Sequence, residues 1–203
     1  FFNIIVLFFQ WLSTICSICF LVVFNDFISI WIGDKYVLDI SVVLALAINF
    51  YIQNIINPVW IYRETMGLYS QIKYLMIIAA TINLILSLAL GYIWGIFGII
   101  ISTAISRILT TVWYEPKVIF KEKFKLPLNN YWNMQIKQFI LAIISLLLTI
   151  EVIHSWPGTL TFIFIKIIIV LFIVSTLFFL FNYRTREFLL LFNYANKLIR
   201  KQQ

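Results

Sequence analysis

The residue most able to do chemistry in this sequence is an arginine inside an apolar segment. Arg107 lies in 101-ISTAISRILTTVWYEP-116, where a charge at the bilayer centre costs at least about 2.5–3.5 kcal/mol. On a helical wheel, Thr103 and Thr111 lie about 40° to either side of Arg107, and Tyr114 about 20° away. We predict that these four side chains form one polar face. A guanidinium group can bind phosphate through two parallel hydrogen bonds, so this face is a candidate phosphate-binding surface.

Small residues occupy another side of the same segment. Gly98, Ser102 and Ser106 recur every four residues and lie roughly 100–180° from Arg107 on the wheel. Small residues let two membrane helices approach closely, so this ridge is expected to contact another helix. The alternative for Arg107 is that it extends along its own stem to the lipid headgroups.

Polar side chains form stripes on three other apolar segments. The stripes hold Gln10 with Asn3, Thr14 and Ser17; Asn49 with Gln53 and Asn57; and Asn83 with Ser87. They predict a cavity that is wetted from the cytoplasm and closed by apolar residues toward the outside. Its candidate substrate-binding residues are Arg107, Thr103, Thr111, Asn49, Gln53 and Gln10. The alternative is that the stripes are helix contacts, each worth less than about 1–2 kcal/mol.

Other reactive residue types lack the partners that catalysis would need. Cys16 and Cys19 form a C-x-x-C motif inside an apolar helix without a second pair, which does not favour a zinc or redox site. The only histidine, His154, adjoins the turn 155-SWPG-158, so we expect an interfacial loop residue. No glycine-rich phosphate loop is present. We therefore expect no catalytic residue, no metal site and no cofactor, and a protein that is not an enzyme.

Charged residues near the outer loops have two interpretations. Asp26, Asp34 and Asp39 cluster within 25-NDFISIWIGDKYVLD-39. They could bind a cation or a sugar, or they could simply solvate an outer loop. Lys166 is expected to extend to the nearby membrane surface, because it lies about six residues from the outer end of its helix.

Composition and periodicity predict an all-α membrane protein with about six transmembrane helices. The chain is 63% hydrophobic and 11% charged, with a mean hydropathy of +1.01. A membrane helix needs about 20 apolar residues, and segments such as 139-FILAIISLLLTI-150 lack the alternation of barrel strands. The predicted spans are Ile4–Phe24, Val37–Trp60, Tyr74–Leu90, Ile93–Tyr114, Ile136–Ile153 and Leu160–Phe181.

The basic residues predict the orientation of the chain in the membrane. Twelve of the 15 basic residues fall in segments that share one side when the N-terminus is cytoplasmic, whereas Lys35 alone falls in an outer loop. This bias predicts a multi-pass protein of the plasma or inner membrane with both ends in the cytoplasm. The net charge of +7 is explained by topology and by membrane lipids as partners, without a nucleic acid.

The segments divide the chain into four parts. We predict a four-helix part of a transporter lobe at 1–115, a basic cytoplasmic loop at 116–135, two peripheral accessory helices at 136–182 and an amphipathic cytoplasmic tail at 183–203. Because the first residue is Phe and an apolar segment follows at once, we expect the C-terminal portion of a longer protein.

Four short segments, in their order, resemble a known family. These are 27-FISIWIGDKYV-37, 63-RETMGLY-69, 95-GIFGIIISTAISRIL-109 and 113-WYEP-116. Residues 1 to 120 resemble the later part of O-antigen and capsule polysaccharide flippases, which belong to the multidrug, oligosaccharidyl-lipid and polysaccharide exporter superfamily. The last two spans match in position and hydrophobicity alone.

The resemblance implies two pseudo-symmetric lobes that open alternately to the two sides of the membrane. It implies a cargo of oligosaccharide repeat units on undecaprenyl diphosphate, and an N-terminal lobe that precedes these residues as a partner. A drug or small-molecule exporter of the same superfamily is one alternative. A membrane-embedded glycan polymerase and a structural membrane subunit are others.

Overall fold

The protein is a bundle of helices in which at least five stretches can cross a membrane. The structure is a computed structural model that describes residues 1–191. Its helices are α1 (Phe2–Trp31), α2 (Ile40–Thr65), α3 (Tyr69–Leu109), α4 (Thr111–Ile119), α5 (Asn129–Ile153) and α6 (Leu160–Asn182), with a 3-10 turn η1 (Asp34–Tyr36) and a π-helical turn η2 (Phe120–Phe124). Five helical stretches are long and apolar enough to span a bilayer, and residues 1–191 contain no strand. The predicted fold class is confirmed.

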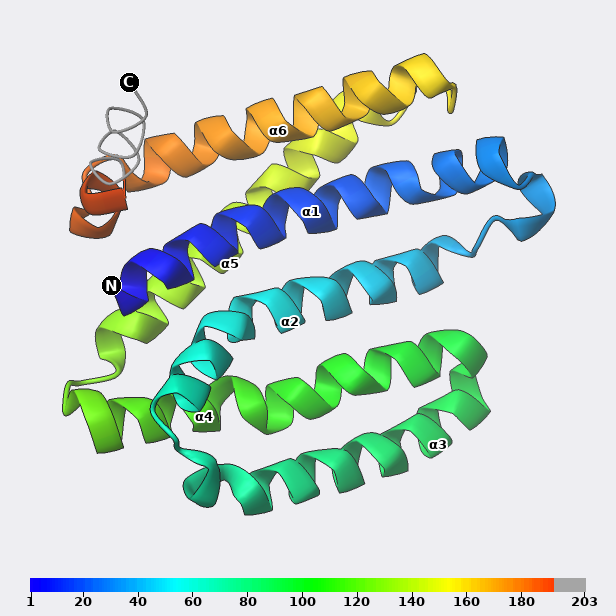
Figure 1. The fold of residues 1–203 in the computed structure, drawn as a ribbon. Coiled ribbons are helices and arrows are strands. Elements are labelled where there is room, and N and C mark those ends of the chain that lie inside the picture. Colours follow the sequence, from blue (N-terminus) through cyan, green and yellow to red (C-terminus); the bar gives the residue numbers. More distant parts are fainter. Residues whose placement is uncertain (192–203) are drawn as a thin grey trace.

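Helix α3 is a hairpin of two arms. Its backbone reverses at Gly95, where φ is 59° and ψ is −136°, a combination that strongly favours glycine. The first arm, 69–94, and the second arm, 96–109, lie side by side in opposite directions (Figure 1). With α1, α2, α5 and α6, these arms account for the six predicted segments.

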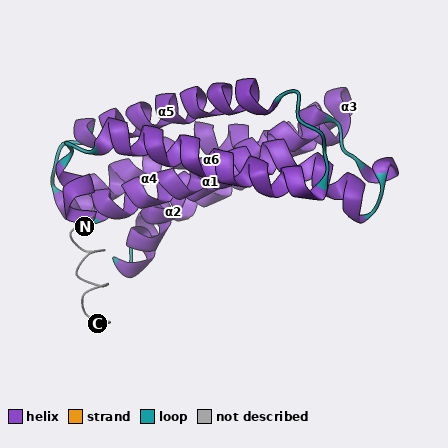
Figure 2. Ribbon diagram, turned by 90° about the horizontal axis from the view of Figure 1, so that it is seen from above, coloured by secondary structure: helices purple, strands orange, loops and turns teal. Residues whose placement is uncertain are grey.

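The helices form a row with one helix laid across it. Helix α1 packs between α2 and α6, α2 packs against α3, and α5 contacts both α1 and α6 (Figures 1 and 2). We use the term basic end for the end of the bundle that holds the last residues of α2, helix α4, the turn η2 and the first residues of α5. The positive-inside pattern predicts that this end faces the cytoplasm.

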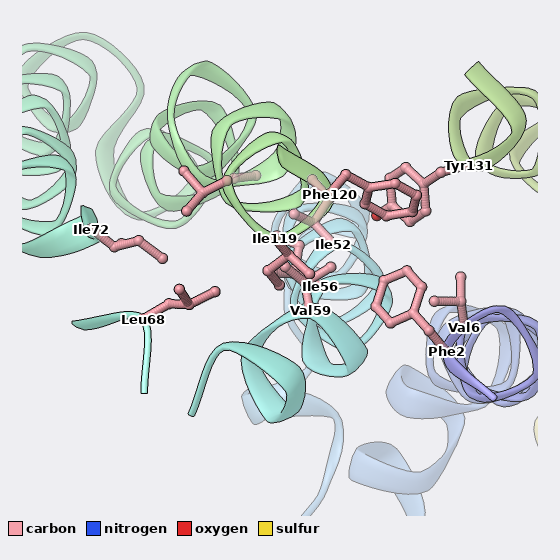
Figure 3. Packing of buried hydrophobic residues seen from close by; sticks show 12 residues of the cluster. Phe2, Val6, Ile52, Ile56, Val59, Leu68, Ile72, Ile119, Phe120 and Tyr131 are labelled. Atoms are coloured by element: carbon pink, nitrogen blue, oxygen red, sulfur yellow. The ribbon is translucent and has the colours of Figure 1, made fainter. Parts of the chain in front are cut away.

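One hydrophobic cluster joins five helices near the basic end. It combines α1, α2, the start of α3, the region of α4 and η2, and the start of α5 (Figure 3). Its buried members include Phe2, Val6, Ile52, Ile56, Val59, Ile72, Ile119, Phe120 and Tyr131. Because helices in lipid gain little from hiding apolar surface, close packing of such side chains is what holds this end together.

A second cluster attaches the last two helices to α1. Ile15 and Ile18 of α1 pack with Ile153 of α5 and with Val170 and Val174 of α6. A buried hydrogen bond of 2.7 Å from Gln138 to Asn182 also joins α5 to α6. Helix α6 lies at the edge of the row and α5 crosses it, and polar as well as apolar contacts hold these two helices (Figure 1).

The segment predicted as a basic loop at 116–135 is mostly helical. Helix α4 runs to Ile119, η2 continues to Phe124, and α5 already begins at Asn129. The prediction of a loop rested on two prolines, four lysines and scattered aromatic residues, but Pro116 lies inside α4 without ending it. The predicted tail at 183–203 lies mainly outside the described residues, since the structure describes it only to residue 191.

The ridge of small residues makes the helix contact that its spacing predicts. Gly98, Ser102 and Ser106 are buried. A hydrogen bond of 2.7 Å joins the hydroxyls of Ser102 and Ser87 across the hairpin. A Cβ atom at Gly98 would lie 2.0 Å from the carbonyl oxygen of Leu90, so only glycine fits there.

This contact predicts a large effect of the smallest possible substitution. Gly98→Ala should destabilise the protein by about 1–3 kcal/mol, because the added methyl group forces the two arms apart. The midpoint of thermal unfolding in detergent measures the loss. Ile96→Ala, at a side chain that is 66% exposed, is the matched control and should unfold near the wild-type temperature. Equal midpoints for both variants would contradict the close approach.

Candidate functional site

Arg107 is half-buried in the second arm of α3 and has no counterion among residues 1–191. It makes no hydrogen bond and no ion pair with any residue in the described part of the chain. The other cations that lie deep in helices are paired, as shown below. Arg107 therefore carries a charge that the described chain does not neutralise.

The neighbours of Arg107 on its helix show which way it points. The hydroxyl of Thr103 accepts a hydrogen bond of 3.2 Å from Asn83 of the first arm. Ala104 is 1% exposed and belongs to the cluster with Ile52 of α2. On the helical wheel Arg107 lies between these two directions, about 40° from Thr103 and about 60° from Ala104. Its side chain is therefore directed between the first arm of α3 and helix α2.

A hydrogen bond from Asn49 fixes how α2 and the second arm of α3 are aligned. Its side-chain nitrogen donates to the carbonyl oxygen of Ile100 at 2.6 Å. Both helices run from that contact toward the basic end. At about 1.5 Å per residue, Arg107 lies about 10 Å beyond Ile100, and Gln53 lies about 6 Å beyond Asn49. The polar stripe of α2 and the face of Arg107 thus occupy the same half of the bundle.

Several of the predicted cavity residues are engaged in helix contacts. Asn49 bonds to α3, and Thr103 bonds across the hairpin. The side chain of Gln10 is 1% exposed and donates a hydrogen bond to Gln135 of α5. For these three residues the geometry matches the alternative interpretation, in which a membrane amide or hydroxyl bonds to a neighbouring helix.

The other predicted residues differ from one another. Gln53 is exposed and bonds to no described residue. Thr111 is 8% exposed and lies 3.3 Å from the hydroxyl of Thr110. The helix breaks at Thr110, where φ is −122° and ψ is −76°, so a single wheel does not extend from Arg107 to Thr111. Tyr114, beyond the same break, packs against the cluster at the basic end.

The cavities on residues 1–191 include three that none of the six predicted residues lines. One of them, of about 670 Å³, opens at the basic end among aromatic side chains that include Phe2, Tyr62 and Phe124. Another, of about 440 Å³, is an almost wholly apolar hollow along α1, α2 and α5. Asn49, Thr103 and Gln10 are thus bound to neighbouring helices, whereas Arg107 and Gln53 bond to no described residue.

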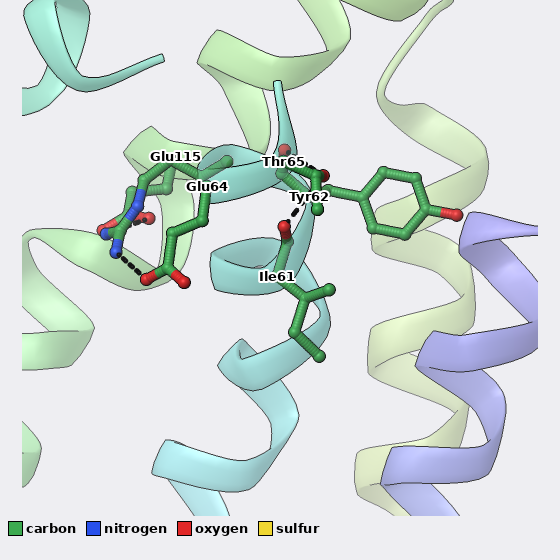
Figure 4. Close-up of polar contacts among 6 residues, drawn as sticks. Ile61, Tyr62, Glu64, Thr65 and Glu115 are labelled. Atoms are coloured by element: carbon green, nitrogen blue, oxygen red, sulfur yellow. Dashed lines mark hydrogen bonds and ion pairs between the residues drawn. The ribbon is translucent and has the colours of Figure 1, made fainter. Parts of the chain in front are cut away.

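A buried ion pair at the basic end joins two of the segments that carry the family resemblance. One terminal nitrogen of Arg63 lies 3.2 and 3.1 Å from the two carboxylate oxygens of Glu115, and the other lies 3.1 Å from Glu64 (Figure 4). Arg63 is 7% exposed and Glu115 is 2% exposed. The pair clamps the end of α2 to α4. Sequence reasoning missed it, although 63-RETMGLY-69 and 113-WYEP-116 carry opposite charges at the ends of spans.

A second ion pair corrects the interpretation of Lys166. Its amino group lies 2.6 Å from Asp26 of α1, and the residue is 5% exposed. The turn between α5 and α6 covers the pair, because a Cβ atom at Gly158 would lie 2.7 Å from a carboxylate oxygen of Asp26. Lys166 therefore does not extend to the membrane surface, and Asp26 is a partner of α6 rather than a loop residue that only solvates the surface.

No family model matches this sequence, and no curated protein or solved structure is significantly similar to it. The geometry of the site is thus the main basis on which a function can be argued.

The ion pair of Arg63 with Glu115 predicts that a single variant loses more stability than the double variant. Arg63→Met should cost about 3–5 kcal/mol, because it leaves Glu115 buried without a cation. Adding Glu115→Leu should restore much of that loss, which thermal unfolding in detergent measures. Glu64→Gln is the control, since the Glu64 side chain is 56% exposed and should change stability by less than about 1 kcal/mol. A double variant as unstable as Arg63→Met would contradict a simple pair.

The pair between α1 and α6 predicts that removing the acid is worse than removing the base. Asp26→Asn should cost about 3 kcal/mol, because the Lys166 side chain is only 6% exposed and would be left alone. Lys166→Met should cost about 1 kcal/mol, because the side chain of Asp26 is 27% exposed and can be solvated. Unfolding midpoints measured side by side give the order. The reverse order would show that Asp26 is the more deeply buried partner.

Proposed function

We propose that this chain is part of a transporter that moves lipid-linked oligosaccharide units across a membrane. The observation that carries the proposal is Arg107, a half-buried cation in a membrane helix without a counterion among the described residues. A charge at this position is costly, and intramembrane charges commonly mark the path of a substrate. An anionic group on a transported molecule would supply the missing partner.

The contrast with the other buried cations supports this proposal. Arg63 and Lys166 each have a carboxylate within 3.2 Å, which is the usual way to hold a charge in a low-dielectric interior. Arg107 is directed between α2 and the first arm of α3, and it lacks such a partner. The unpaired charge of Arg107 therefore destabilises the protein, and a bound anion would offset that cost.

The chemistry of arginine suggests which ligand this is. Its planar fork donates two parallel hydrogen bonds to phosphate, and it stays charged at any physiological pH. The exposed amide of Gln53 lies in the same half of the bundle and offers donors and acceptors to sugar hydroxyls. A diphosphate bearing an oligosaccharide, such as the undecaprenyl diphosphate cargo implied by the resemblance, combines both groups.

An exporter of cationic drugs is the alternative from the same superfamily. Such a protein would be expected to hold an unpaired carboxylate at depth. Asp26 in α1 and Glu115 in α4 are instead each paired with a cation. The excess charge inside the bundle is positive, which favours an anionic cargo.

Replacing Arg107 in the full-length protein tests the proposal. Arg107→Ala should lower export of surface polysaccharide about tenfold or more, because the loss of charged hydrogen bonds of about 1.5–3 kcal/mol reduces affinity by that factor. Lipid-linked precursor should accumulate at the same time. Arg107→Lys keeps the charge but loses the planar guanidinium group. Export by this variant should therefore lie between that of the wild type and that of Arg107→Ala.

Thr103→Val is the matched control for a structural effect. It removes the hydrogen bond with Asn83 one turn away but leaves the cation in place, so export should stay near the wild-type level once membrane insertion is confirmed. Normal export in Arg107→Ala would contradict the phosphate contact. Equal losses in Thr103→Val and Arg107→Ala would indicate that the hairpin, rather than the charge, is what export requires.

A further inference from the structure

The turn η2 places its aromatic and basic side chains on different sides. The sequence 120-FKEKF-124 puts Phe120 and Phe124 into the cluster at the basic end, while Lys121 and Lys123 are exposed. In a π-helix the hydrogen bonds run from i to i+5, so this turn is wider than an α-helical one. Turns of this kind are rare in proteins, and those that occur are often found at functional sites. This segment is therefore a candidate for a function.

Aromatic contacts hold the turn in place. The ring of Phe124 lies 5.1 Å from Phe120, 5.3 Å from Phe2 of α1 and 6.0 Å from Tyr62 of α2. These distances lie in the range of favourable edge-to-face pairs. The basic side chains of η2 are therefore presented by a fixed piece of backbone rather than by a free loop.

Four lysines project from this segment without partners. Lys117 of α4, Lys121 and Lys123 of η2, and Lys125 directly after it are all exposed. None of them belongs to an ion pair with a described residue. The buried Glu115 is already bound by Arg63, so the exposed Glu122 is the one acid within residues 117–125, against four lysines.

Lys125 adds an independent observation. It has a left-handed backbone, with φ at 52°, and is the one non-glycine residue with positive φ among residues 1–191. This conformation strains most side chains and favours glycine or asparagine. A lysine gains nothing from this conformation, so its exposed charge is the more informative property of this position.

We propose that these four lysines form a binding surface for anionic phospholipid headgroups, which we name the lysine ridge. The ridge lies at the ends of membrane-spanning helices, where headgroups are the nearest anions. It is flanked by Trp113, which is 46% exposed, and by Leu126, which is 63% exposed. Tryptophan is enriched at the membrane interface, and clusters of lysine next to membrane helices attract anionic lipids. This role is separate from transport by Arg107.

A lipid-exchange experiment on the full-length protein tests the lysine ridge. The protein is placed in nanodiscs with equal amounts of phosphatidylglycerol and phosphatidylcholine, and the lipids retained on release are measured by native mass spectrometry. The wild type should retain phosphatidylglycerol in excess at low salt, and the excess should fall at high salt because ions screen exposed charges. The variant K121Q/K123Q/K125Q should lower the retained ratio about tenfold.

Two further variants separate charge from other effects. Replacing the same three lysines by arginine should keep the excess, since the charge is unchanged. The variant K197Q/R200Q/K201Q removes an equal charge from the tail, outside the described residues, and should also keep it. Equal retention of both lipids by the wild type would overturn the proposal. So would an unchanged ratio in the three-glutamine variant, or a loss confined to the tail variant, which would place the lipid contact in the tail.

Discussion

A polar side chain inside the hydrocarbon must be paired within the protein, because the lipid offers no hydrogen bond. This constraint orders the bundle. Four pairs of long helices are joined by such a contact: Gln138 with Asn182 for α5 and α6, Lys166 with Asp26 for α6 and α1, Gln10 with Gln135 for α1 and α5, and Asn49 with Ile100 for α2 and α3. Apolar packing fills the space between the helices and joins α1 to α2.

The same constraint makes Arg107 an exception with consequences. Every other deeply placed cation in the described chain is bound by a carboxylate, and Asn49 and Thr103 are bound by their neighbours. Arg107 is directed between α2 and the first arm of α3 without such a group. Under the proposed function, an anionic group on the transported molecule would be the partner of Arg107. Phosphate is the anion that the shape of arginine fits best.

Features set by local periodicity could be predicted from the sequence. The apolar segments predicted the helices, and the spacing of Gly98, Ser102 and Ser106 predicted the side on which the two arms approach closely. Both features depend only on residues a few positions apart. Partners could not be predicted in the same way. A helical wheel shows the direction in which Gln10 or Asn49 points. It does not show whether the side chain meets water or another helix there. Lys166 meets Asp26 across 140 positions, which no local pattern reveals.

The basic residues of this chain are distinguished by their counterions rather than by their type. Arg63, bound to Glu115, fixes α4 against α2. Helix α4 directly follows the arm of α3 that carries Arg107. It also contains the first lysine of the lysine ridge and leads into η2. One compensated charge thus positions two uncompensated groups, one half-buried and one exposed. Because Arg107 is half-buried and the lysines are exposed, we expect them to bind different ligands. A cation directed between helices suits an anion that enters the bundle, whereas exposed lysines suit the headgroups that are always present.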